Sequence, residues 1–400
     1  MISALITKPG RRIECTCDPE SVVPRASLGP IVWSTGTVGS GARNSFHLGL
    51  SASWEPDLWG KVRRQVESTR AGAEASAADV ANVRLSAQSQ LAIDYVQLRA
   101  DDELKRLTDQ TVEAYGRSLQ IAQNRYNAGT AAKNDLLTAQ VQLANAQAQS
   151  AELARDRQTL EHAIAVLSGQ APAELTIAPV AWALPVPQVP VSVPSVLLQR
   201  RPDIAAAERQ VASANAQIGV QEAAFFPTLS LTGQYGQATP TLGQLFAAST
   251  NFWSLGASAA ATLLDFGARK ARVHQAEAAH DQTVAQYRQT VLSAFQEVED
   301  ALTASRVLAD EAPLRVQASQ AGDGAETIAL NQYRAGMSDY TAVAVAQSGA
   351  LSARQALVSN QRDRITAALQ LIAAMGGGWS AHAGAGANTS AQTLTQAQGR

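Results

Sequence analysis

Two six-residue stretches, NRYNAG at residues 124–129 and NQYRAG at residues 331–336, decide how the chain is organised. They lie 207 residues apart, the difference between positions 129 and 336. The same offset aligns further landmarks: Gly60 with Gly267, Gly169 with Gly376, and the triplet RDR at 155–157 with its copy at 362–364. Because one shift aligns all of them without an insertion, the sequence predicts an internal duplication.

Each repeat contains a long segment of helix-forming residues. From Val62 to Arg125 there is no proline, and 64 helical residues would extend about 96 Å. Apolar or small residues recur every third or fourth position in both repeats, which is typical of a coiled-coil seam. The glycines at 129 and 336 suit a left-handed helix end followed by a reversal. Each repeat is therefore predicted to form a long antiparallel helical hairpin.

Three segments alternate apolar residues with small neutral-polar ones, namely Phe46–Trp54, Thr228–Tyr235 and Trp253–Leu263. Length, alternation and scarcity of charge are typical of transmembrane β-strands. Three strands cannot close a barrel, and open edges are not tolerated in lipid, so several copies must pool their strands. The residues expected to face lipid are Phe46, Leu48, Leu50, Trp54, Leu229, Leu231, Tyr235, Trp253, Leu255 and Leu263.

These patterns give an expected division of the chain. It comprises an irregular N-terminal segment at 1–43, a first repeat at 44–170, a proline-rich connector at 171–196, a second repeat at 197–379 and a disordered tail at 380–400. The second repeat opens with a helix whose counterpart would fall before residue 1. We therefore expect an N-terminally truncated chain without its export signal, in which a degraded fourth strand survives near residues 22–28.

Composition excludes several classes of protein. The net charge of −2 and the charged fraction of 16% give no basic surface for nucleic acid. No apolar run reaches the length of a transmembrane helix. The five histidines are scattered and the two cysteines have no partner pair, so neither a metal site, a cofactor nor a catalytic centre is expected. The sequence gives no indication of an enzyme.

Five motifs together carry a resemblance to a known family. They are SWEPDLWG at 53–60, RRPDIAAAE at 200–208, AAFFPTLSL at 223–231, DFG at 265–267 and EVEDAL at 297–302. In this combination the chain resembles outer-membrane efflux proteins of the TolC/OprM type, specifically the NodT-like lipoproteins of RND efflux systems. The resemblance covers about residues 44–379.

The resemblance implies a mainly α-helical protein with a β-barrel part. It implies a homotrimer whose pooled strands span the outer membrane, in contact with its lipid, above a periplasmic barrel of helical hairpins. Such a trimer is the passive exit duct of a tripartite efflux system. Its implied partners are a periplasmic adaptor (membrane fusion protein) and an inner-membrane pump of the RND type, with drugs or other small solutes as cargo.

The resemblance also implies a gate at the periplasmic tip, where helices close an iris through tyrosine and acidic side chains. Residues that match this gate are Tyr126, Gly129, Asp135, Tyr333, Gly336 and Asp339. The second repeat departs from the family pattern, because Ala342 and Val345 replace acids and leave Asp339 as the nearest one. The alternative is that both tyrosines only pack the hairpins.

Two other functions remain open from the residues. An exit channel of a protein-secretion system would use the same kind of tube, although the motifs at 53–60 and 200–208 favour small-molecule efflux. A soluble coiled-coil scaffold would explain the helical seams. It would not explain alternating strands almost without charge, because soluble coiled coils carry many charged flanking residues.

Overall fold

The computed structural model describes residues 25–28, 32–36, 43–182, 184–187, 201–240, 243 and 247–377. The tail expected at 380–400 and the last part of the connector lie outside the described residues. The chain divides into two units. The first, Met1–Val66 with Ala216–Ala276, holds the strands, and the second, Glu67–Asn215 with Glu277–Arg400, holds most of the helical residues.

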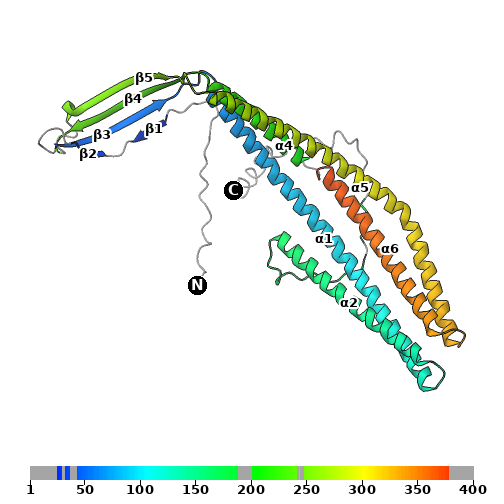
Figure 1. Cartoon of the computed structure of the whole chain (residues 1–400). Helices are drawn as coiled ribbons and strands as arrows, with labels where there is room; N and C mark the ends of the chain where they lie inside the picture. Colours follow the sequence, from blue (N-terminus) through cyan, green and yellow to red (C-terminus); the bar gives the residue numbers. More distant parts are fainter. Residues whose placement is uncertain are drawn as a thin grey trace, which may run out of the picture. The chain divides into compact units, whose positions relative to one another are not determined.

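The first unit contains one antiparallel sheet, in which β3, β4 and β5 lie side by side (Figure 1). Its strands are β1 (Arg25–Leu28), β2 (Val32–Gly36), β3 (Arg43–Trp54), β4 (Thr228–Thr239) and β5 (Asn251–Ala260). The order is β1-β3-β4-β5, and β2 also pairs with β3. A short 3-10 turn, η2 (Ala248–Thr250), leads into β5.

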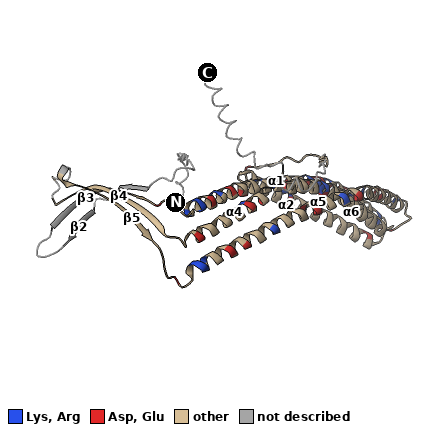
Figure 2. Ribbon diagram, turned by 90° about the horizontal axis from the view of Figure 1, so that it is seen from above, with Lys and Arg blue, Asp and Glu red and all other residues tan. Residues whose placement is uncertain are grey.

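The strand register places most large apolar side chains on one face of the sheet, although Phe252 lies on the other. Leu50 lies opposite Tyr235, which lies opposite Trp253, so these three share one face of the sheet. The neighbouring positions Ser51 and Ser254, both paired with Gln234, belong to the other face. Strands β4 and β5 carry no charged residue (Figure 2). The alternation expected from the sequence is thus present in the sheet.

Two glycines let β3 and β4 approach closely. Gly49 lies directly opposite Gly236, and a Cβ atom at Gly236 would lie 2.6 Å from the carbonyl oxygen of Leu48. The same Cβ would be 2.9 Å from the ring of Phe252, which packs over this position from β5. Any larger residue at Gly236 would therefore push the strands apart.

The strands differ from the sequence expectation at their ends. β4 and β3 are longer than expected, whereas β5 ends at Ala260, so Leu263 lies beyond the strand in which it was expected. The segment expected to be irregular contains β1 and β2. β1 overlaps the expected fourth strand near residues 22–28 and pairs with the second half of β3.

The helices follow the 207-residue offset. They are α1 (Lys61–Asn127), α2 (Lys133–Ser168), α4 (Pro202–Ala223), α5 (Ala268–Arg334) and α6 (Tyr340–Ala374). α1 and α5 both have 67 residues, and each boundary of one is the other's shifted by 207. α2 and α6 begin at equivalent positions. The repeat therefore relates structural elements as well as sequence landmarks.

Glycines with positive φ end the helices at equivalent places. Gly129 and Gly336, after α1 and α5, have φ values of 71° and 76°. Gly169 and Gly376, after α2 and α6, have φ values of 76° and 87°. Side chains rarely adopt this conformation, so glycine is favoured at each helix end. The long hairpins predicted from the sequence are confirmed.

Alanine dominates the interior of the helical unit. Side chains with no exposed area include Ala122, Ala139, Ala294 and Ala350. Such small residues allow helix backbones to approach closely. α4 packs beside α1 through a serine pair, in which the Ser213 hydroxyl donates to the Ser68 carbonyl oxygen over 2.9 Å. Among the described residues of the second unit, the buried apolar side chains form small clusters.

Candidate functional site

The turns of the two hairpins meet at one end of the helical unit. A cluster of buried residues joins all four long helices there: Ala122, Ala139, Ala329, Tyr333, Tyr340, Val343 and Ala344. The turn tyrosines are unlike in their environment, because Tyr333 is 1% exposed and Tyr126 is 39% exposed. The equivalent tyrosines of the two repeats therefore have different surroundings within one chain.

Arg125 holds the two hairpins together at this tip. Its Nη1 donates to the backbone carbonyl oxygen of Tyr333 over 2.6 Å. Its guanidinium carbon lies 4.6 Å from the centre of the Tyr333 ring, which is a cation–π contact. Because Arg125 belongs to the end of α1 and Tyr333 to the end of α5, this one side chain joins repeat one to repeat two.

Tyr333 packs edge-to-face against Tyr340, with ring centres 5.4 Å apart. Burial raises the pKa of both phenols above their ordinary value. Interactions with Ser118 at Tyr340 and with Arg125 at Tyr333 oppose this rise. Nearby, the Gln347 amide lies 3.4 Å from the Ser118 hydroxyl of α1. The tip is thus a tightly packed, uncharged core with the Arg125 cation at its edge.

The two tip acids occupy the starts of the returning helices. Asp339 is the N-cap of α6, and its carboxylate accepts from the Ala342 backbone N–H over 3.1 Å. Asp135 lies in the first turn of α2, and its charge contributes to raising the pKa of Tyr333. Both positions favour a negative charge because the N-terminus of a helix carries partial positive charge.

Two of the sequence motifs meet where the strands of the first unit join the helices. The Trp59 indole N–H donates to the Pro227 carbonyl oxygen over 2.7 Å, and its ring stacks on Phe226 at 4.7 Å. The Arg269 guanidinium lies 5.4 Å from the Phe225 ring. The motif SWEPDLWG therefore contacts the motif AAFFPTLSL. Arg269, which follows the DFG motif, covers the Phe225 ring of AAFFPTLSL.

The start of the connector is fixed to the first hairpin by buried ion pairs. Arg157 pairs with Asp102 at 2.6 Å and with Glu161 at 3.0 Å. Arg157 also donates to the carbonyl oxygen of Ile177, whose own N–H donates to Glu161 over 2.5 Å. Arg99 donates to the Ala178 carbonyl oxygen over 2.8 Å. These contacts bind the connector backbone directly to α1 and α2.

This network exists in only one repeat. The counterparts of Asp102 and Glu161 at the 207-residue offset are Ala309 and Ala368, which cannot form ion pairs. Repeat one thus carries charges that repeat two lacks, and it is repeat one that precedes the connector. We interpret the network as the anchor of the connector.

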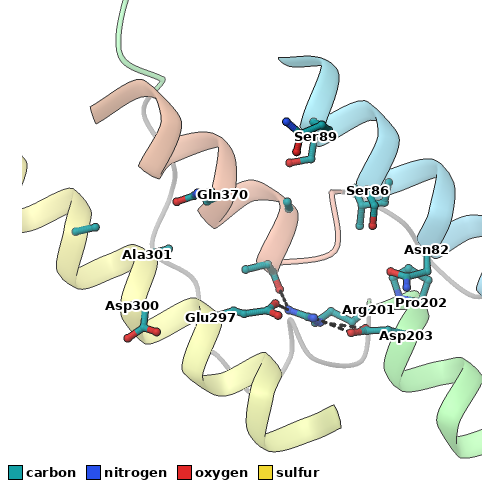
Figure 3. A pocket seen from close by; sticks show the side chains of 15 residues that line it. Asn82, Ser86, Ser89, Arg201, Pro202, Asp203, Glu297, Asp300, Ala301 and Gln370 are labelled. Carbon is teal, nitrogen blue, oxygen red and sulfur yellow. Dashed lines mark hydrogen bonds and ion pairs between the residues drawn. The ribbon is translucent and has the colours of Figure 1, made fainter. Parts of the chain in front are cut away.

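A second buried arginine, Arg201, binds the C-terminal end of α6. Arg201 binds Asp203 at 2.7 Å, Glu297 at 2.7 Å and the carbonyl oxygen of Ala374 at 3.1 Å (Figure 3). It lies on the wall of a cavity of about 680 Å³ between α1, α4, α5 and α6. The motif RRPDIAAAE therefore supplies a clamp that joins α4 to the second hairpin.

The structure brings together only part of the expected gate. Tyr333, Gly336, Asp339 and the buried cluster lie at one tip with Gly129 and Asp135, whereas Tyr126 lies outside the buried cluster and is partly exposed. Sequence reasoning missed Arg125 and Tyr340. The signal for Arg125 was present, because it is the one position at which NRYNAG and NQYRAG differ before the tyrosine.

The residues expected to face lipid differ in exposure. Leu48, Leu229 and Leu231 are half-buried, the side chain of Phe46 lies outside the described residues, and the others are exposed in the single chain. Exposed fractions are 48% for Leu50, 57% for Tyr235, 74% for Trp253 and 79% for Leu255. Leu263, 89% exposed, belongs to the segment between β5 and α5. A row of apolar side chains this exposed on one sheet face is characteristic of a surface that another apolar phase covers.

Comparison with known proteins assigns the family. Residues 25–170 and 193–377 match the family model described as outer membrane efflux protein. The chain therefore belongs to the outer membrane efflux protein family, and its function is efflux at the outer membrane.

Two similar proteins come from Pseudomonas putida. The toluene efflux pump outer membrane protein TtgC is 31% identical over 346 residues, which are 86% of this chain and 71% of TtgC. The pyoverdine export outer membrane protein OpmQ is 30% identical over 338 residues, which are 84% of this chain and 72% of OpmQ.

Solved structures show the same fold. The outer-membrane channel OprN is 31% identical, with a TM-score of 0.81 over 89% of this chain and 81% of OprN. The outer membrane protein VceC of Vibrio cholerae is 26% identical, with a TM-score of 0.80 over 88% of this chain and 87% of VceC. The resemblance expected from the sequence motifs is confirmed.

Two further observations concern the described part of the chain. No helix there has a stretch both long and apolar enough to cross a bilayer. Nor do three or more His, Cys, Asp or Glu side chains of those residues come close enough to hold a metal ion.

Proposed function

We propose that three copies of this chain form the exit duct of a tripartite efflux system. In this assembly the sheets of the three copies close a β-barrel in the outer membrane, and the helical hairpins line a periplasmic passage. The observation that carries the proposal is the exposed apolar row on β3, β4 and β5, opposite a face that is mostly small or polar and includes Phe252. An apolar outer face and a polar inner face are what a membrane barrel requires.

The open sheet edge supports pooling of strands. Among the described residues, β5 pairs with β4 alone, so the backbone groups on its other side have no strand partner. An unpaired edge in hydrocarbon costs several kcal/mol for each unsatisfied group. A neighbouring copy that supplies a strand removes this cost. We therefore assign the missing partner of β5 to a second copy of the chain.

The partners follow from the family. TtgC is an efflux pump outer membrane protein and OpmQ an export outer membrane protein, and a passive duct needs a separate source of energy. We assign that role to an inner-membrane pump of the RND type, connected through a periplasmic adaptor that contacts the hairpin tips. The cargo is a small solute, since relatives of similar identity carry names as unlike as toluene and pyoverdine.

A pair of arginine variants on neighbouring residues of β5 tests the membrane assignment. Leu255 belongs to the apolar face and Ser254 to the opposite one. Leu255→Arg should abolish accumulation in the outer membrane, because arginine on the lipid face costs roughly 2–4 kcal/mol near the bilayer centre. Ser254→Arg should be tolerated, because it faces the polar side. The measurement is the amount of full-length protein in outer-membrane fractions of a sucrose gradient.

The same fractions test the assembly and the alternatives. Heat-modifiable migration of a trimer on a gel, together with restored solute resistance in a strain lacking its own duct, is the expected result. A protein that stays in the soluble fraction would support the coiled-coil scaffold and contradict the proposal. Restored protein secretion without restored solute resistance would support a secretion channel.

A further inference from the structure

The two helices that follow the strands of the first unit both begin with basic residues. Residues 58–66 and 266–276, which contain the starts of α1 and α5, hold six Lys or Arg and no Asp or Glu. We call these six cations the basic collar: Lys61, Arg63, Arg64, Arg269, Lys270 and Arg272. Figure 2 shows the part on α5 as the blue segment beyond β5. Both repeats therefore have the same charge at the same place.

The basic collar opposes the helix dipole. The N-terminus of a helix carries partial positive charge, so cations in the first turn are unfavourable. The other long helices begin with acids, because Asp135 and Asp203 lie in the first turns of α2 and α4 and Asp339 is the N-cap of α6. α1 and α5 have no acid in the first turn. The collar therefore disfavours both helix starts unless an outside negative charge balances it.

Half of the basic collar is exposed to solvent in the single chain. Lys61, Lys270 and Arg272 are exposed side chains. Arg269, in contrast, pairs with Asp265 at 2.6 Å. The described residues of the first unit include only four acids, and two of these are the aspartates that cap α1 and α5. The first unit thus has a surplus of exposed positive charge beside its sheet.

Exposed apolar side chains lie between the strands and the basic collar. Leu263 and Leu264 are 89% and 82% exposed, and Phe266 is fully exposed. In the first repeat, Leu58 and Trp59 occupy the corresponding place and are 59% and 49% exposed. Each repeat thus continues from the apolar row of the sheet through apolar or aromatic residues to cations. Hydrocarbon, interface and headgroups follow one another in the same order at the boundary of a membrane.

We infer that the basic collar binds the anionic headgroups of phospholipids in the periplasmic leaflet of the outer membrane. The inference rests on the membrane barrel proposed above and adds the class of lipid that its lower boundary selects. Phosphate oxygens accept strong hydrogen bonds from Lys and Arg. A free phosphate ion would leave the neighbouring apolar residues uncovered, whereas a lipid offers an anion and an acyl chain in one molecule. The occupant is therefore a lipid.

Lipid retention by the full-length protein tests this inference. Protein extracted from outer membranes in a neutral detergent is mixed with equal amounts of phosphatidylglycerol and phosphatidylethanolamine that have identical acyl chains. Mass spectrometry of the intact complexes counts each lipid. The parent should retain phosphatidylglycerol at least about fivefold more often, since each cation near an anionic membrane surface contributes roughly that factor. Lys61→Gln, Lys270→Gln and Arg272→Gln combined should reduce this preference to less than about twofold.

A second triple variant provides the matched control. Arg117→Gln, Lys133→Gln and Arg306→Gln remove the same number of exposed charges from the second unit and should leave the preference unchanged. Equal losses in the two triple variants would attribute the effect to net charge and overturn the inference. A parent that accumulates in the outer membrane but retains both lipids equally overturns this inference alone. A protein that stays in the soluble fraction overturns it together with the proposed function.

Thermal unfolding in detergent separates lipid binding from a structural role. The collar variant should unfold at the same temperature as the parent or higher, because the removed cations oppose the helix dipole. A lower midpoint without added phosphatidylglycerol would show that the collar stabilises the helix starts themselves, and it would contradict the inference.

Discussion

Arg125 shows how a single position distinguishes two otherwise equivalent repeats. Its guanidinium makes a hydrogen bond and a ring contact with the same residue, Tyr333. The Tyr333 carbonyl oxygen, at the end of α5, accepts this hydrogen bond in addition to one from the Gly336 backbone N–H at 3.0 Å. A cation at the C-terminal end of a helix is also favoured by the helix dipole. Three effects therefore act through one side chain.

Replacing Arg125 by the residue found in the other repeat should weaken the tip. Arg125→Gln is expected to lower the free energy of unfolding by roughly 1–3 kcal/mol, since it removes a cation–π contact and a charged hydrogen bond. Arg117→Gln is the control, because the Arg117 side chain is 71% exposed and its ion pair with Glu113 is long, at 3.9 Å. Thermal unfolding followed by helical circular dichroism measures both. Equal midpoints for the two variants would contradict the role of Arg125.

A buried carboxyl group of α1 makes stability depend on pH. Burial raises the pKa of Asp101 to about 6, although Gln97 donates a hydrogen bond to it and Arg362 attracts its charge. The charges of Asp156 and Asp102 raise the pKa further. The folded protein therefore binds a proton at Asp101 more tightly than the unfolded chain does, whose ordinary value is 3.8.

The sign of the pH effect follows from this difference. The stabilising contribution is fully present below the unfolded pKa of 3.8 and is lost as pH rises through about 6. The shift corresponds to about 3 kcal/mol. Asp101→Asn, which stays neutral, should therefore gain stability relative to the parent as pH rises, with no gain near pH 3.8. Denaturant midpoints across this range provide the measurement, and a difference between Asp101→Asn and the parent that stays constant with pH would contradict the prediction.

At the residue scale, the sequence predicted where the turn residues lie better than how deeply they are buried. The turn glycines follow from their residue type, since positive φ favours glycine, and this prediction is confirmed. The difference between Tyr126 and Tyr333 could not be predicted, because both have the same local motif. Burial depends on which hairpin packs against which, and that information is not local.

At the element scale, the start of α1 shows what one family motif does. Asp57, inside SWEPDLWG, accepts hydrogen bonds from the backbone N–H groups of Val62 and Arg63 at 3.1 and 2.9 Å. Although burial opposes it, these bonds and Arg63 lower the pKa of Asp57. Asp265 of the DFG motif binds the N–H groups of Gly267 and Arg269 in the same way. Both motifs therefore begin a 67-residue helix.

Removal of the Asp57 carboxylate should fray the start of α1. Asp57→Ala is expected to cost about 1 kcal/mol, the usual contribution of a helix cap, and Asp57→Asn should cost less because its side-chain oxygen still accepts. The Asp57 contribution is present above the ordinary pKa of 3.8 and is lost as pH falls below it. Glu55→Ala, two residues earlier and exposed, is the control in the same unfolding measurement.

Helices were easier to predict than strands. The long helices have good helix formers, few breakers and glycine at their ends, so local chemistry fixes their bounds. Strand β5 ends three residues before Leu263 although the apolar alternation continues to that residue. The end of a strand depends on its partner, and β4 begins at Thr228, opposite Ala260. The end of β5 is therefore set by its pairing with β4, which the local sequence of β5 does not reveal.

The matched lengths of α1 and α5 restrict how such a gene can change over time. Adding or deleting one residue in either helix turns everything beyond it by about 100° and displaces it by about 1.5 Å. The turn after the altered helix would no longer lie beside the turn of the other hairpin, and the Arg125 contact with Tyr333 would be lost. An insertion or deletion in α1 is therefore tolerated only with an equal change in α5, and the reverse. Insertions and deletions in these helices should occur in pairs.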